Sequence, residues 1–258
     1  MNRITFVSFF LFCFVLSAKA QHTTQNAHSH NDYQHESPFY EAYLHKFGSV
    51  EADIFAIEGK LFVAHIRSEV KPERTIDSLY IHPIVTSFRE NRGKAWKDSP
   101  FTYQLLIDIK TEIEPALSIL TEKLKLYPDV FNPSVNKNAI RIVITGNRPE
   151  PSGFRNYPRF IFFDGKLNTK YNRNQLKRVA LFSANMKQFT QWNGETTIPV
   201  KEEEHLKQVI DSVHGLNKKI RFWNAPDTIS SWKTLMEMNV DYINTDEISE
   251  LSGFLLSK

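Results

Sequence analysis

Residues 49–54 read Ser-Val-Glu-Ala-Asp-Ile, and the apolar character of this stretch continues to Ile57. Successive side chains of a β-strand point to opposite faces, so Glu51 and Asp53 share one face. A single Glu-x-Asp pair is a weak signal, because solvated strand ends often carry acids, but burying charged groups without partners inside apolar strands is strongly unfavourable. Carboxylate oxygens are ligands of hard cations, and we expect this pair to hold one divalent ion, Ca²⁺ or Mg²⁺.

Short runs rich in β-branched and aromatic residues recur along the chain and alternate with helix-like stretches. Several are apolar at both parities, which is typical of parallel strands covered on both faces. Residues 60–65 follow a turn and return beside the strand before them. The expected barrel strands cover residues 26–30, 49–57, 102–110, 140–145, 159–163, 179–183, 219–223 and 241–244.

Helical patterns separate these runs. Residues 113–127 form one that ends before Pro128, and Asp227 is expected to cap another that runs to Met238. Eight strands separated by helices in about 238 residues predict a (β/α)8 TIM-like barrel. A doubly wound open sheet is the alternative, but no Gly-rich phosphate loop follows the first strand. A further helix ends before Gly215 and has an apolar face made of Leu206, Val209, Ile210 and Val213.

Residues 1–20 have the pattern of a secretory signal peptide. Arg3 gives a positive start, residues 4–16 are apolar, and Ala18-Lys19-Ala20 forms a small-x-small cleavage site. The apolar run is too short to span a bilayer as a helix, although an uncleaved anchor or a buried helix is the alternative. We therefore expect a secreted or periplasmic protein with a single barrel domain over residues 21–258, since no linker interrupts them.

The composition excludes several classes of protein. Hydrophobic residues make up 41% of the chain and include 20 Phe, which excludes disorder. Removing Arg3 and Lys19 with the leader lowers the net charge from +3 to about +1, which argues against a nucleic-acid binder. Cys13, the only cysteine, lies in the leader, so the mature chain has no disulfide and no Cys nucleophile. We expect no stable membrane insertion, and we expect a monomer.

Histidines concentrate early in the chain, where six of the nine precede residue 66. His30 closes the first expected strand, and a turn returns the chain so that His65 lies at the same end. At the end of the next strand, Asp108 and Lys110 share one face. Each group alone has a structural interpretation, such as a solvated histidine or a local ion pair. In a barrel, however, they converge with the first acidic pair at the C-terminal rim, which favours an active site.

In order and spacing these motifs resemble the phosphatidylinositol-specific phospholipase C-like phosphodiesterase superfamily, which includes glycerophosphodiester phosphodiesterases and the spider-venom type phospholipases D. The nearest branch is the bacterial and fungal one related to the yeast altered inheritance of mitochondria protein. Two departures are Ile66, where an acid is common, and Asp108 in place of Glu, as in the venom-type branch. The resemblance covers nearly the whole mature chain and rests on residues 29–33, Glu51, Asp53, His65, Asp108, Lys110 and 240–246, with 72–75, 192–194 and 221–223 for the branch.

The resemblance implies a metal-dependent phosphodiesterase. His30 would act as a base toward the attacking hydroxyl or water, or as a nucleophile by the venom-type analogy. His65 would protonate the leaving oxygen, and Lys110 would add fixed positive charge beside the phosphate. One divalent cation, Ca²⁺ or Mg²⁺, would bind a phosphate oxygen, and its ligands would be Asn31, Glu51, Asp53 and Asp108.

The second half of the chain offers fewer candidates. Trp223 ends the seventh strand and is expected to pack against a substrate head group, with a core aromatic as the alternative. Arg148 follows the fourth strand and is a candidate phosphate contact, although a loop arginine is usually solvated. Asp246 ends the eighth strand and is expected to hold a loop or cap the last helix rather than to act in catalysis.

Two rival functions stay open. A metal-dependent amidohydrolase also uses a His-x-His after the first barrel strand, as His28 and His30 supply, but no histidine lies between His82 and His205 to complete such a site. A non-catalytic barrel would bind a phosphorylated or sugar ligand, and it would be expected to lack part of the catalytic set. We expect a small phosphodiester or a phospholipid as substrate, cleaved either by water or with release of a cyclic phosphate.

Overall fold

The computed structural model describes residues 22–257 of the 258-residue chain, and the predicted leader, residues 1–20, lies outside them. Each predicted strand is present within this part of the chain. The nine strands of the sheet are β1 (Ala27–Ser29), β2 (Ser49–Ile57), β3 (Lys60–Val63), β4 (Gln104–Ile109), β5 (Arg141–Gly146), β6 (Ile161–Gly165), β7 (Val179–Asn185), β8 (Lys219–Trp223) and β9 (Ile243–Thr245).

Eight strands follow the order β8-β7-β6-β5-β4-β2-β1-β9, and adjacent strands are parallel. A parallel bridge between Arg221 and Tyr242 joins β8 to the residue before β9, so the sheet closes into a nearly complete barrel. The predicted TIM-like barrel is therefore confirmed, and the open sheet is wrong. The remaining strand, β3, pairs antiparallel with β2 after a tight turn at Glu58 and Gly59, where both φ angles are positive.

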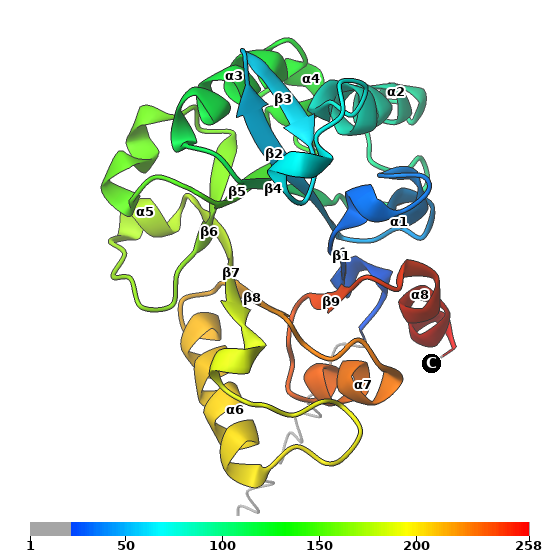
Figure 1. The fold of residues 1–258 in the computed structure, drawn as a ribbon, viewed down its shortest axis with the longest axis vertical. Helices are drawn as coiled ribbons and strands as arrows, with labels where there is room; N and C mark the ends of the chain where they lie inside the picture. Colours follow the sequence, from blue (N-terminus) through cyan, green and yellow to red (C-terminus); the bar gives the residue numbers. More distant parts are fainter. Residues whose placement is uncertain (1–21, 258) are drawn as a thin grey trace, which may run out of the picture.

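Helices lie outside the ring of strands, as Figure 1 shows. None of them, within residues 22–257, is both long enough and apolar enough to cross a membrane. The α-helices are α1 (Tyr40–Leu44), α2 (His82–Glu90), α3 (Ile113–Lys125), α4 (Pro128–Phe131), α5 (Arg173–Leu176), α6 (Val200–His214), α7 (Ile229–Glu237) and α8 (Ile248–Leu256). Shorter 3-10 helices, with one π-helix at η4, are η1 (Thr24–Asn26), η2 (Asp32–Gln34), η3 (Arg67–Glu69), η4 (Asp77–Ile81), η5 (Pro151–Asn156) and η6 (Met186–Gln188).

The start of α7 differs from the prediction that Asp227 caps it. The cap is Thr228, whose extended backbone lets its side-chain oxygen accept a hydrogen bond from Ser231 N at 3.2 Å. Asp227 instead accepts from Trp232 Nε1 at 2.7 Å and from the backbone N–H of Asp246 at 2.6 Å. It therefore ties the start of α7 to the end of β9.

Alternation along the strands sorts the barrel interior into an apolar base and a polar upper layer. The base is a small buried cluster, separate from the main core, made of Leu106, Val143, Leu181 and Tyr242. Two residues further along the same strands the side chains are polar, namely Asp108, Thr145, Ser183 and Asn244. The polar layer thus lies nearer the carboxyl ends of the strands, which is where barrels of this type carry their sites.

Candidate active site

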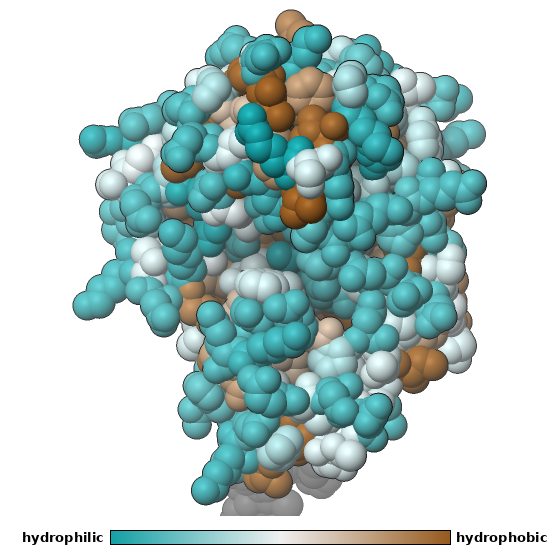
Figure 2. All heavy atoms as spheres, in the orientation of Figure 1, coloured by the Kyte–Doolittle hydropathy of each residue, from teal (hydrophilic) through white to brown (hydrophobic). Residues whose placement is uncertain are grey.

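A cavity of about 1010 Å³ opens among the residues of the polar layer and the loops that follow the strands. The face shown in Figure 2 is mainly hydrophilic and is hollowed near its centre. The structure brings every residue predicted for the site to the wall of this one cavity. These residues are His30, Asn31, Glu51, Asp53, His65, Asp108, Lys110, Arg148 and Trp223.

The three predicted acidic ligands form one cluster. Glu51, Asp53 and Asp108 each offer a carboxylate oxygen, and these oxygens lie within 4.8 Å of one another. Asp53 Oδ1 is buried and has no hydrogen-bond partner among residues 22–257, so it can accept a ligand of the cluster. Gly146 makes room for the third acid, because a Cβ at this position would lie 1.9 Å from Asp108 Oδ1. Oxygen donors with one orphaned atom fit a hard divalent cation, and they suit Ca²⁺ and Mg²⁺ alike.

Lys110 lies between two of these acids. Its Nζ is 2.9 Å from Asp53 Oδ2 and 2.9 Å from Asp108 Oδ2. Burial opposes the charge of Lys110, but the two carboxylates outweigh it and raise its pKa. The pKa of Asp53 is nevertheless raised from 3.8 to about 6, because the carboxyl is buried and lies near Glu51. One ammonium group therefore does not neutralise the cluster, and a further cation is favoured there.

His30 is held by Asp246, an acid to which the sequence analysis gave a different role. Its Nδ1 lies 2.9 Å from Asp246 Oδ1, because β9 pairs with β1 and brings the two strand ends together. Burial lowers the pKa of His30, but the hydrogen bond to Asp246 and the charge of Glu51 outweigh it and raise the pKa. Asp246 does not cap α8, whose N-cap position is Glu247 and which has no side-chain cap hydrogen bond among the described residues. Its carboxylate positions the His30 ring instead.

His65 is linked to the acidic cluster through Tyr33. The Tyr33 hydroxyl donates to Asp53 Oδ2 at 2.7 Å and lies 3.0 Å from His65 Nδ1. It also lies 2.9 Å from Asn31 Oδ1, which brings the fourth predicted metal ligand to the edge of the cluster. His65 Nδ1 is itself 3.4 Å from Asp53 Oδ2. Tyr33 belongs to the motif that carried the resemblance, but nothing in the sequence indicated that it fixes three site residues relative to one another.

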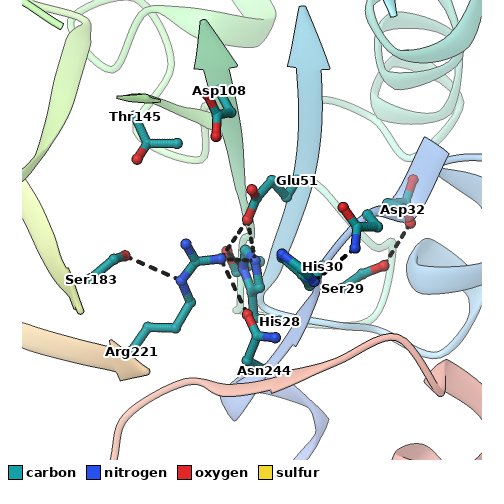
Figure 3. A network of polar contacts seen from close by, with 12 residues as sticks. His28, Ser29, His30, Asp32, Glu51, Asp108, Thr145, Ser183, Arg221 and Asn244 are labelled. Carbon is teal, nitrogen blue, oxygen red and sulfur yellow. Dashed lines mark hydrogen bonds and ion pairs between the residues drawn. The ribbon is translucent and has the colours of Figure 1, made fainter. Parts of the chain in front are cut away.

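Arg221 of β8 is the main site residue that the sequence interpretation missed. Its guanidinium contacts Glu51 and His28 in the barrel interior, as Figure 3 shows. Burial raises the pKa of Glu51, but Arg221 and His28 outweigh it and hold that pKa well below its usual value. The available signal was its spacing of two from Trp223, which places both side chains on one face of the strand.

His28 does not form the metal-binding pair of an amidohydrolase with His30. Burial, assisted by Arg221, lowers the pKa of His28 to about 3, so the ring is neutral. Its Nδ1 lies 2.7 Å from Ser49 Oγ and its Nε2 lies 2.8 Å from Glu51 Oε2. Both ring nitrogens are therefore engaged with the protein, and the amidohydrolase arrangement is not formed.

The far side of the cavity carries the remaining candidates. Arg148 donates to Gly146 O at 3.1 Å, and Trp223 is 36% exposed, so both are accessible to a ligand. Asp164 of β6 also lines the cavity, although the sequence did not single it out. It accepts a hydrogen bond from Thr145 Oγ1 at 2.9 Å, and burial raises its pKa.

An eight-stranded barrel that carries two histidines, three clustered acids and a lysine at its strand ends defines a phosphodiesterase-like barrel. Residues 17–164 match the AIM6-like phosphodiesterase domain. The chain belongs to this family. Residues 219–248 match the glycerophosphoryl diester phosphodiesterase family, and they include β8 and β9.

Similar proteins occur among fungi, and one similar structure is bacterial. "Altered inheritance of mitochondria protein 6" of Kluyveromyces lactis is 27% identical over 300 residues, covering 89% of this chain and 72% of that protein. Its homolog in Arthroderma benhamiae is 25% identical over 263 residues, covering 88% and 82%. A glycerophosphodiester phosphodiesterase from Parabacteroides distasonis superposes with a TM-score of 0.52 at 11% identity, covering 91% of this chain and 95% of that one. This last likeness supports the fold.

Proposed function

We propose that the protein is a metal-dependent phosphoric diester hydrolase that cleaves a glycerophosphodiester or a phospholipid-type P–O bond. The observation that carries this proposal is how the ring nitrogens of His30 and His65 are hydrogen-bonded. In His30 and His65 the Nδ1 atom contacts a carboxylate, from Asp246 and Asp53 respectively. Neither Nε2 atom has a hydrogen-bond partner among the described residues. Both rings line the cavity that holds the acidic cluster, so both Nε2 atoms are available to one substrate.

The two histidines divide the proton transfers. Nδ1–H of His30 donates to Asp246, which leaves the Nε2 lone pair as a base toward the attacking hydroxyl or water, or as a nucleophile. His65, whose Nδ1 lies 3.4 Å from Asp53 Oδ2, would donate a proton from Nε2 to the leaving oxygen. Lys110 contributes positive charge beside the phosphoryl group.

The acidic cluster would hold the metal. Glu51, Asp53 and Asp108 would supply the carboxylate oxygens, and Asn31, which the Tyr33 hydroxyl links to Asp53, would contribute its amide oxygen. Bound Ca²⁺ or Mg²⁺ would act as a Lewis acid that offsets charge developing on the phosphoryl oxygens.

Turnover of a small phosphodiester panel tests the proposal. The panel contains glycerophosphodiesters and phosphatidylinositol, each incubated with Ca²⁺, Mg²⁺ or a chelator. We expect cleavage that depends on the metal and that is lost in His30→Ala. His214→Ala is the matched control, because His214 also pairs with an aspartate, Asp241 at 2.8 Å, but is not part of the cavity wall. Absence of turnover in a folded, metal-loaded protein would contradict the proposal and favour a barrel that only binds a phosphorylated or sugar ligand.

Export of the protein is also proposed, on the pattern of residues 1–20 alone. The experiment is N-terminal sequencing of the protein recovered from its natural cells. A mature N-terminus near Gln21 would support cleavage, whereas a retained Met1 would contradict it.

A further inference from the structure

Arg221 reaches across the barrel interior, and its Nη2 makes no hydrogen bond to the described residues. The residue is 3% exposed, its Nε donates to Ser183 Oγ at 3.1 Å, and its Nη1 contacts Glu51, His28 and Asn244. Nη2 has no hydrogen-bond partner among the described residues, and it is not among the polar atoms that are shut off from solvent. It is therefore open to the cavity that Arg221 lines.

Figure 3 shows where this nitrogen points. It is directed into the space between Thr145 and Glu51, below Asp108, and no contact is drawn to it. This space adjoins the acidic cluster, so a group bound there meets both the cluster and the guanidinium. A guanidinium N–H that faces a polar cavity is best satisfied by an anionic oxygen acceptor.

A second arginine in the same protein shows what a purely structural role looks like. Arg178 is partly buried, and all three of its nitrogens donate to backbone carbonyl oxygens. Nε and Nη2 donate to Ile161 O, at 3.1 and 2.7 Å, and Nη1 donates to Phe154 O at 2.9 Å. Arg221 differs because its contacts fix the guanidinium while leaving one edge free. That is the arrangement of a preorganised ligand-binding group.

Arg221 does not exclude a metal from the cluster. Its Nη1 and His28 Nε2 both approach Oε2 of Glu51. Oε1 of Glu51 has no hydrogen-bond partner among the described residues, so it remains available to a cation. The guanidinium and a divalent ion can therefore occupy opposite sides of the same carboxylate.

We propose that Arg221 binds a non-bridging phosphoryl oxygen of the substrate through Nη2, as a fixed cation at the floor of the cavity. The ligand class rests on the proposed phosphodiesterase function. A guanidinium brings a fixed positive charge and donor N–H groups to this position. Glu51, Ser183 and Asn244 hold the group in place before substrate arrives, so binding does not have to order a long side chain.

The test is binding of inorganic phosphate to the full chain, measured by isothermal titration calorimetry in Mg²⁺ buffer. Arg221→Lys keeps a positive charge beside Glu51 but removes the free Nη2 edge. We expect phosphate affinity to fall about tenfold or more, as for loss of a charge-assisted hydrogen bond. Arg178→Lys is the matched control and should leave phosphate affinity unchanged. A folded Arg221→Lys protein with wild-type phosphate affinity would overturn the proposal.

A second measurement covers the case in which Arg221→Lys does not fold. Side-chain ¹⁵N NMR of the wild-type protein should show that phosphate shifts the Arg221 signals and leaves those of Arg178 in place. Unchanged Arg221 signals at saturating phosphate, or no phosphate binding at all, would overturn the proposal. Arg221-dependent phosphate binding without turnover of any diester would leave this inference standing and contradict the proposed function. Diester turnover together with phosphate binding that does not depend on Arg221 would support the proposed function and overturn this inference.

Discussion

Replacing Asp53 by asparagine is expected to stabilise the metal-free protein. Asp53 is 1% exposed, and within the described part of the chain its Oδ1 has no hydrogen-bond partner. Its pKa rises from 3.8 to about 6 on folding, because the carboxyl is buried and lies near Glu51. At about 1.4 kcal/mol per pKa unit, the ionised group costs about 3 kcal/mol of folding free energy above pH 6.

The direction in which this cost changes with pH follows from proton linkage. The folded state binds the Asp53 proton more tightly than the unfolded state, so the contribution of Asp53 to the stability of the metal-free protein becomes less favourable as pH rises from about 4 to about 6. Asp53→Asn removes the charge and keeps an oxygen that can accept from Tyr33, while Lys110 loses one of its two carboxylate partners. Allowing for that loss, we expect a net gain of about 1–2 kcal/mol near pH 8 that shrinks toward zero near pH 4.

Urea unfolding in chelator at the two pH values measures this difference, with Asp129→Asn as the control. Asp129 is an exposed acid paired with Arg89 at 3.0 Å, and its replacement should change stability only slightly. A second arm adds Ca²⁺ or Mg²⁺, which should stabilise the wild-type protein and have little effect on Asp53→Asn. If Asp53→Asn were no more stable than wild type in chelator near pH 8, Lys110 would already neutralise Asp53, and the electrostatic argument for a cation site at this cluster would fail.

Three further predictions concern the catalytic side chains and their supports. His30→Ala and His65→Ala should each lower kcat by about 10²- to 10⁴-fold with unchanged thermal unfolding, and an active variant would remove that histidine from the mechanism. Asp246→Asn should lower the pKa of His30, since Asp246 raises it, and a ¹⁵N–¹H NMR titration of the ring would show the shift; an unchanged His30 pKa would contradict the assignment of Asp246 as its positioning residue. Gly146→Ala should displace Asp108, because Gly146 has a φ of +64° and the added Cβ would lie 1.9 Å from Asp108 Oδ1. Calorimetry should then show weaker binding of Ca²⁺ or Mg²⁺. Wild-type metal affinity in this variant would exclude Asp108 as a ligand.

The barrel was predictable because its strands are apolar on both faces and its inward positions alternate with period two. That period placed Glu51 and Asp53 together, and likewise Asp108 and Lys110, as the structure has them. The same rule applied to β8 would have placed Arg221 on the face of Trp223. An arginine in a strand does not by itself indicate a site, because its role depends on partners that the fold brings together.

Other parts of the site depend on long-range closure and on local backbone geometry. Asp246 becomes a partner of His30 only because β9 pairs with β1, with Ser29 opposite Thr245. The exchange of roles between Asp227 and Thr228 depends on the extended backbone of the residue that caps α7. A short sequence motif predicts neither feature. The first depends on pairing between residues about 200 positions apart, and the second depends on the φ and ψ angles of Thr228.

The charges at the cavity floor explain why the proposed metal and phosphate belong together. Glu51, Asp53 and Asp108 carry three negative charges when ionised, and Lys110 and Arg221 contribute two positive ones. A divalent cation converts the remaining negative charge into a positive one, which a singly charged diester then balances. Each ligand therefore improves the electrostatic environment of the other, and by linkage each must raise the affinity of the other by the same factor.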